Sequence, residues 1–145
     1  MNKPLDLAKL ARLLPDDAPP AVRKAIAGEH ANHLTGQDLV RTAATLVLGD
    51  DHEVSRVLVE SADLRSALFE LAADADATFA RLQDATLSDS ARKGLADDLA
   101  RTLPARRAAI VSSARTRVAA TTSDRLDRAL DVLVRVAVAV AGALV

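Results

Sequence analysis

The last twenty residues constrain the fold of this chain more than any other segment, because their charge disappears along their length. Charged side chains are frequent up to Asp131, Arg135 stands alone after it, and residues 136–145 read VAVAVAGALV. An apolar run of this kind has to be covered by the core of the protein, by a partner chain or by a membrane. A membrane-spanning helix needs about 20 predominantly apolar residues, so this run is too short to cross a bilayer comfortably.

The composition favours a helical protein with an aliphatic core. Half of the 145 residues are apolar, but Phe69 and Phe79 are the only aromatic ones. The strong helix formers Ala, Leu and Arg are abundant, whereas there are only five Gly and five Pro. We therefore expect one all-α domain over residues 1–145, a compact multi-helix bundle in which alanines let the helices approach closely. The chain has no Cys, which excludes disulfides and thiolate chemistry.

Apolar periodicity and capping residues divide the chain into seven to eight helices joined by short turns. Thr35 with Asp38 predicts a capping box, and Asp50 with Glu53 repeats that signal. Pro104 is expected to open a new helix. The expected helices span residues 5–14, 21–32, 36–48, 50–60, 61–85 (starting at Ser61 or Asp63), 88–103 (starting at Ser88 or Ser90), 104–120, and the tail after a turn at 121–124.

The tail combines a strand-like pattern with a helix-like one. Val occupies every second position from 132 to 140, as in a β-strand. A second apolar set steps by four and three residues, which is an a/d register over nearly three heptads. A lone strand would have no partner in a helical chain, so we predict a helix. Its apolar seam would lie in the bundle core or in an oligomer interface, and it consists of Leu126, Leu130, Leu133, Ala137, Val140 and Leu144.

Two segments of the chain resemble each other. Residues 10–15, LARLLP, match residues 99–104, LARTLP, in five of six positions. Weaker matches follow each segment once the register is shifted for an insertion, residues 16–20 (DDAPP), in the first copy. We therefore expect an internal repeat, in which a three-helix unit at residues 5–48 recurs at residues 93–135.

The sequence carries no catalytic signature. A Gly-x-Ser-x-Gly motif and a Gly-rich phosphate loop are both absent. His30 and His33 lie three residues apart beside Glu29, so they can share a helix face, but a metal site in a bundle draws its ligands from several helices in a paired pattern that is missing. We expect no enzyme activity, no metal site and no cofactor, and we infer no small-molecule substrate.

Charge is distributed unevenly, although the net charge is only −1. Residues 1–99 hold 11 basic and 17 acidic side chains, whereas residues 100–145 hold eight Arg and three Asp. Such asymmetry can guide one half onto an anionic partner or onto a neighbouring copy, but it can also reflect unevenly solvated helix faces. Arg106 and Arg117, three helical turns apart, are the residues we expect to contact a nucleic acid. The chain has no aromatic residues placed to stack on bases.

These observations favour a non-enzymatic helical module that contacts a partner protein or other copies of itself, most simply as a homo-oligomer. Membrane association through the tail is an alternative, and nucleic-acid binding by the Arg-rich C-terminal third is a second one. Residues 1–14 contain no unbroken apolar stretch, so no signal peptide is expected. We expect a cytoplasmic protein, peripheral to a membrane if the tail contacts lipid.

Overall fold

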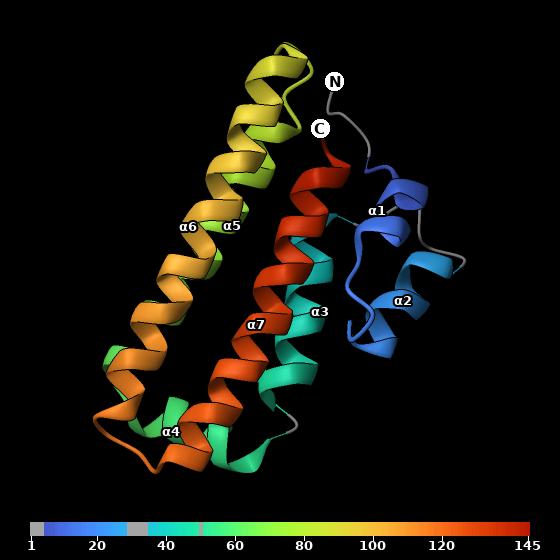
Figure 1. Ribbon diagram of the computed structural model, residues 1–145. Helices are drawn as coiled ribbons and strands as arrows, with labels where there is room; N and C mark the ends of the chain where they lie inside the picture. Colours follow the sequence, from blue (N-terminus) through green and yellow to red (C-terminus); the bar gives the residue numbers. More distant parts are fainter. Residues whose placement is uncertain (1–4, 29–34, 50) are drawn as a thin grey trace.

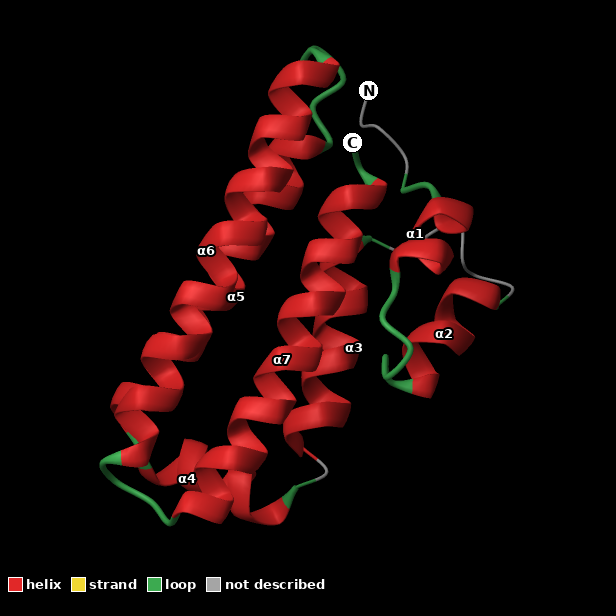
Figure 2. Ribbon diagram, in the orientation of Figure 1, coloured by secondary structure: helices red, strands yellow, loops and turns green. Residues whose placement is uncertain are grey.

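Helices account for all the secondary-structure elements of the computed structural model (Figure 1), which describes residues 5–28, 35–49 and 51–145. The absence of strands among the elements in these ranges is also evident in Figure 2. The all-α prediction is therefore confirmed. In chain order the helices are α1 (Leu7–Leu13), α2 (Pro20–Ala27), α3 (Gly36–Gly49), α4 (His52–Glu60), α5 (Ala62–Leu82), α6 (Asp89–Arg115) and α7 (Ala120–Ala143).

The four longest helices form an antiparallel bundle. In Figure 1, α3 and α6 run downwards, α5 and α7 run upwards, and the short α4 joins α3 to α5 at the base. α7 packs against both α6 and α3, α5 packs against α6, and α1 lies across the C-terminal part of α7. α2 packs against α3. Short connections between consecutive helices produce this antiparallel order.

The C-terminal tail is a helix, as the a/d register predicts, and it forms the centre of the core. α7 contributes more buried residues than any other described helix. Val136, Val140, Ala141 and Leu144 are inaccessible to solvent. The alternating valines fit this arrangement because α7 has neighbours on several sides, so its buried face is wide enough to include Val134, Val136 and Val140, while Val132 and Val138 are partly buried at its edges. Of the three ways to cover the apolar run, the chain uses its own core.

Several helices begin at the residues that their capping chemistry predicts. The hydroxyl of Thr35 accepts from the backbone N–H of Asp38 at 3.1 Å, and the Asp38 carboxylate accepts from the Thr35 N–H at 3.1 Å, which is a complete capping box. Ser61 caps α5 through Leu64 N–H, and Ser88 caps α6 through Ala91 N–H. Adjacent residues determine these ends, so the sequence predicted the start at Thr35, and Ser61 and Ser88 are each one of the two starts that it offered.

Other predicted ends were wrong by a few residues. Asp51 caps α4, where the sequence suggested Asp50, because its carboxylate reaches the backbone N–H groups of Glu53 and Val54. α2 ends at Ala27 with Gly28 as its C-cap, and the remainder of the range expected for it lies outside the described residues. α5 ends at Leu82, three residues before the predicted end.

Pro104 does not open a helix, contrary to the prediction, but lies within α6. Proline has no N–H to donate and its ring crowds the carbonyl four residues earlier, yet α6 continues past it. Leu99 and Leu103 before it and Ile110 after it are all buried in the bundle, so packing holds both halves in one helix. The segment 93–135 therefore holds parts of two helices, and the three-helix description does not fit it. The repeat in the sequence itself stays a prediction.

The polar segment 121–124 forms the first turn of α7 rather than the loop that the sequence suggested. Thr122 and Ser123 are buried there. Each hydroxyl has a hydrogen-bond partner, since Thr122 Oγ1 donates to Glu53 Oε2 at 3.1 Å and Ser123 Oγ donates to the Ala120 carbonyl at 2.9 Å. A polar residue can be buried at little cost when it is satisfied in this way.

Candidate functional site

The predicted seam of the tail lies inside the molecule. All of its six residues are at most 2% exposed: Leu126, Leu130, Leu133, Ala137, Val140 and Leu144. Their side chains are covered by other helices of the same chain, so the folded protein presents none of them to a partner. Of the two positions predicted for the seam, the bundle core and an oligomer interface, it occupies the bundle core. An intermolecular contact therefore has to use other residues.

Both arginines expected to contact a nucleic acid are occupied by carboxylates of the same chain. Arg106 Nε lies 2.5 Å from Asp74 and its Nη1 lies 3.6 Å from Glu70. Arg117 Nη2 lies 3.1 Å from Asp63. A phosphate would have to compete with these carboxylates, which all belong to α5. The two arginines therefore join α5 to α6 and to the turn that follows α6.

Ion pairs of this kind also link the Arg-rich C-terminal part of the chain to the acidic residues 1–99. Arg125 on α7 pairs with Glu53 on α4 at 3.2 Å, and Arg135 pairs with Asp17, between α1 and α2, at 2.6 Å. These pairs, like those of Arg106 and Arg117, join a cation of the C-terminal part to a carboxylate of residues 1–99. Each pair is partly exposed and contributes only about 0–1 kcal/mol, so together they orient the helices more than they hold them.

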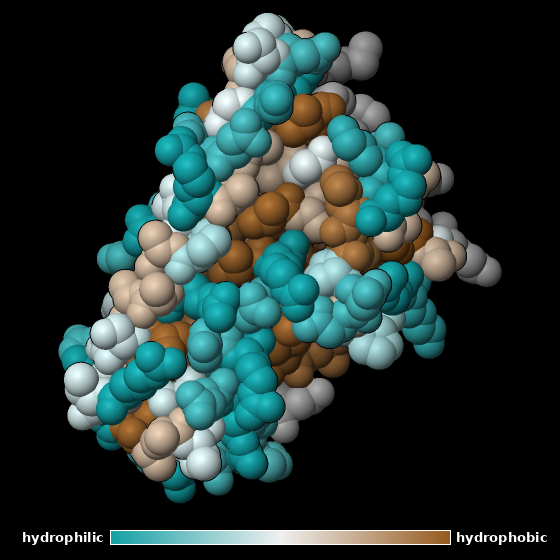
Figure 3. Space-filling model, viewed as in Figure 1, coloured by the Kyte–Doolittle hydropathy of each residue, from teal (hydrophilic) through white to brown (hydrophobic). Residues whose placement is uncertain are grey.

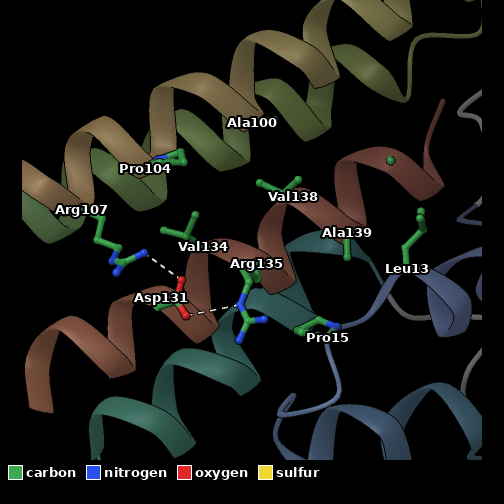
Figure 4. Close-up of a pocket in the computed structure, with 11 residues that line it drawn as sticks. Leu13, Pro15, Ala100, Pro104, Arg107, Asp131, Val134, Arg135, Val138 and Ala139 are labelled. Atoms are coloured by element: carbon green, nitrogen blue, oxygen red, sulfur yellow. Dashed lines mark hydrogen bonds and ion pairs between the residues drawn. The ribbon is translucent and has the colours of Figure 1, made fainter.

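A groove runs along α7 between α1 and α6, on the face that Figure 3 shows as a patch of apolar atoms. We call it the α7 groove. It encloses about 580 Å³. Its lining residues come from the end of α1 and the following turn, from α6 and from α7: Leu13, Pro15, Ala100, Pro104, Arg107, Asp131, Val134, Arg135, Val138, Ala139 and Gly142. Figure 4 shows that Val134 and Val138 follow one another along α7 on the side that faces α6, and that Leu13 lies on the other side of α7.

One end of the α7 groove is closed by a chain of alternating charges. Asp131 accepts from Arg107 at 2.8 Å and lies 3.4 Å from Arg135 (Figure 4). Arg107 also donates to Asp127 at 2.7 Å, and Arg135 donates to both oxygens of Asp17. Each guanidinium in the groove therefore already has two carboxylate partners.

A second exposed apolar feature lies on α5, on the side opposite to its buried residues. Phe69 is 67% exposed there, although it is one of only two aromatic residues in the chain. The exposed residues in line with it are almost all small. We call this set the outer line of α5, and it consists of Ala62, Ser66, Phe69, Ala73, Ala77 and Ala80.

The described residues contain neither a metal cluster nor a membrane-crossing element. Within them, no group of three or more His, Asp or Glu side chains could hold a metal ion. Glu29, His30 and His33 lie outside the described residues. None of the helices in the described part of the chain is long and apolar enough to cross a bilayer.

No family model, curated protein or solved structure matches this chain.

Proposed function

We propose that this protein is a non-enzymatic helical self-association module, and that two copies meet through the outer lines of their α5 helices. The observation that carries this proposal is the exposure of Phe69 in the middle of a line of small residues. Burying a Phe side chain stabilises an interface by about 1.5–3 kcal/mol. Neighbouring alanines support the proposal because they allow a second helix to approach closely enough to cover the ring.

The charges of α5 favour an antiparallel arrangement of the two helices. Asp63 lies in the first turn of α5 and Arg81 in its last turn. When the helices run in opposite directions, Asp63 of each copy faces Arg81 of the other copy, and the helix dipoles are also antiparallel. Asp63 pairs with Arg117 of its own chain, but its side chain is 79% exposed and can accept from a second cation. The twofold axis then passes near Ala72. Phe69 of each copy packs between Ala73 and Ala77 of the other, which makes the contact the same for both copies.

The size of the contact predicts weak association. α5 has 21 residues, which corresponds to a length of about 31 Å and, with a width of about 10 Å, to about 300 Å² per copy. Stable interfaces bury about 800 Å² per partner. We therefore expect a dimer whose population depends on protein concentration.

Self-association through α5 agrees with the helical interaction module that the sequence predicts, but the contact surface is α5 and not the C-terminal tail. The tail has an indirect role in this contact, since α7 packs against α6 and α5 and so stabilises the bundle that presents α5. Nucleic-acid binding and membrane association are less well supported, because the arginines proposed for the first are paired within the chain and the apolar seam needed for the second is buried.

The test is the solution mass of the protein between about 10 μM and 1 mM, a range suited to weak association, measured by light scattering for the wild type and for Phe69→Lys. We expect the wild-type mass to rise towards two chains and the variant to stay at one chain. Lys is a good helix former, so the fold should be kept. Ala105→Lys is the matched control, since Ala105 is also exposed but lies on α6 and is not part of the outer line of α5. A wild type that stays at one chain, or a variant that follows the wild-type curve, would contradict the proposal.

A further inference from the structure

We infer that the α7 groove is a binding site for a neutral small molecule with an aliphatic chain. This site is separate from the outer line of α5 and does not depend on self-association. Its volume of about 580 Å³ falls within the range of about 300–1,000 Å³ that ligand sites occupy.

The shape of the groove suits an extended chain. Val134, Val138 and Gly142 are spaced by four residues along α7, so they form a continuous floor about 12 Å long. The groove is hollow because small residues stand where larger ones would fill it, with Ala100 on the α6 side and Gly142 on the floor. A Cβ atom on Gly142 would lie 3.0 Å from Leu13 Cδ1, so even one methyl group would narrow this end.

The side chains that line the groove favour one class of ligand. The apolar side chains in it are Leu, Val, Pro and Ala, and no aromatic ring is among them. Contacts with such a wall are dispersion contacts that favour an aliphatic chain over a planar ring in need of a stacking partner. Leu13 at the edge of the groove is 46% exposed, so a bound chain would cover apolar surface that is now in contact with water.

The charges at the end of the groove favour a neutral head group. Both oxygens of Asp131 are paired, one with Arg107 and the other with Arg135, and each arginine has a second carboxylate. Charges of both signs line this end of the groove, so an anionic head group would meet Asp131 and a cationic one would meet Arg107 and Arg135. Either head group would lie beside a like charge, which costs binding free energy. A hydroxyl group avoids this repulsion.

The test is a titration with 1-octanol, followed through the methyl NMR signals of Leu13, Val134 and Val138. We expect saturable shifts of these signals, and weaker binding of octanoate and of octylammonium. Ala100→Leu fills the groove from the α6 side and should weaken octanol binding at least tenfold. Ala105→Leu adds the same side chain to the same helix outside the groove and should leave binding unchanged.

A second variant guards against a general effect of Ala100→Leu on the fold. Val138→Thr keeps the shape of the floor and adds a hydroxyl, so it should weaken binding severalfold. The inference is overturned if octanol gives no saturable shifts, if neither groove variant weakens its binding, or if octanoate or octylammonium binds more tightly than octanol.

Discussion

At the residue scale, Arg92 shows how one buried cation shapes a turn. It is only 6% exposed, and it donates from Nη2 to the Asp84 carbonyl at 2.6 Å and from Nε to the Leu82 carbonyl at 3.3 Å. Both carbonyls lie where α5 ends and the chain turns towards α6. The Asp84 carboxylate accepts from the Thr86 hydroxyl and backbone N–H, and these hydrogen bonds lower the pKa of Asp84. The hydrogen bonds of Arg92 and those of Thr86 thus both stabilise the turn between α5 and α6.

Replacing Arg92 by Met should lower the free energy of unfolding by about 1–3 kcal/mol, because both carbonyls lose their donor in a partly buried place. Urea unfolding followed by circular dichroism measures this loss. Arg101→Met on the same helix is the control, since Arg101 is exposed and its pair with Asp98 should contribute no more than about 0.5 kcal/mol. Equal effects of the two substitutions would show that Arg92 does not support the turn.

Gly36 and Gly94 make a second pair of residues for comparison. A Cβ atom on Gly36, at the start of α3, would lie 2.5 Å from Val140 Cγ1 and 3.3 Å from the Phe79 ring, whereas one on Gly94 would meet nothing within 4 Å. Gly36→Ala should therefore destabilise the protein by about 1–3 kcal/mol through overpacking. Gly94→Ala should stabilise it by about 0.5–1 kcal/mol, because Ala is the better helix former. Thermal unfolding of both variants checks the opposite signs, and a shared sign would contradict the packing of α3 on α7.

At the scale of the helices, the sequence predicted ends that depend on a few adjacent residues. Local hydrogen bonds decide the helix start at Thr35 and Asp38, which the sequence predicted, and the start at Ser88, which was one of two predicted positions. Pro104 was misjudged because local chemistry favours a break there, while buried residues on both sides favour continuity. That balance depends on partners distant in the sequence.

Pro104→Ala tests this account of α6. The substitution restores the backbone N–H that can donate to the Ala100 carbonyl, and it removes the clash of the ring. We expect the free energy of unfolding to rise by about 1–3 kcal/mol. Pro20→Ala is the comparison, since Pro20 is the first residue of α2, where a missing N–H costs nothing. A loss of stability in Pro104→Ala alone would mean that α6 needs its proline.

The exposed face of α5 could have been found in the sequence. Leu64, Leu71 and Phe79 mark its buried side, and Phe69 falls on the opposite side of the same helix. The α7 groove could not have been found, because its lining comes from three helices whose relative positions only the fold determines.

At the scale of the whole molecule, contacts within one chain account for two features of the sequence. The apolar tail is covered by its own neighbours, and arginines of the C-terminal part pair with carboxylates of residues 1–99. The sequence left these outcomes open, since the same residues could have been satisfied by a partner chain. The large apolar side chains that remain exposed, of which Phe69 is the largest, are therefore the better guide to association.

Cross-linking of single-cysteine variants is the most direct measurement of the proposed α5 contact. The chain has no Cys of its own, so an introduced one reports without background. In the antiparallel arrangement the two Ala73 residues lie close together near the twofold axis, whereas the two Ala62 residues lie about 30 Å apart along the helices. A disulfide needs Cα atoms within about 7 Å. Under mild oxidation Ala73→Cys should give a covalent dimer and Ala62→Cys should stay monomeric. Equal cross-linking of both variants, or none in Ala73→Cys, would contradict the antiparallel α5 contact.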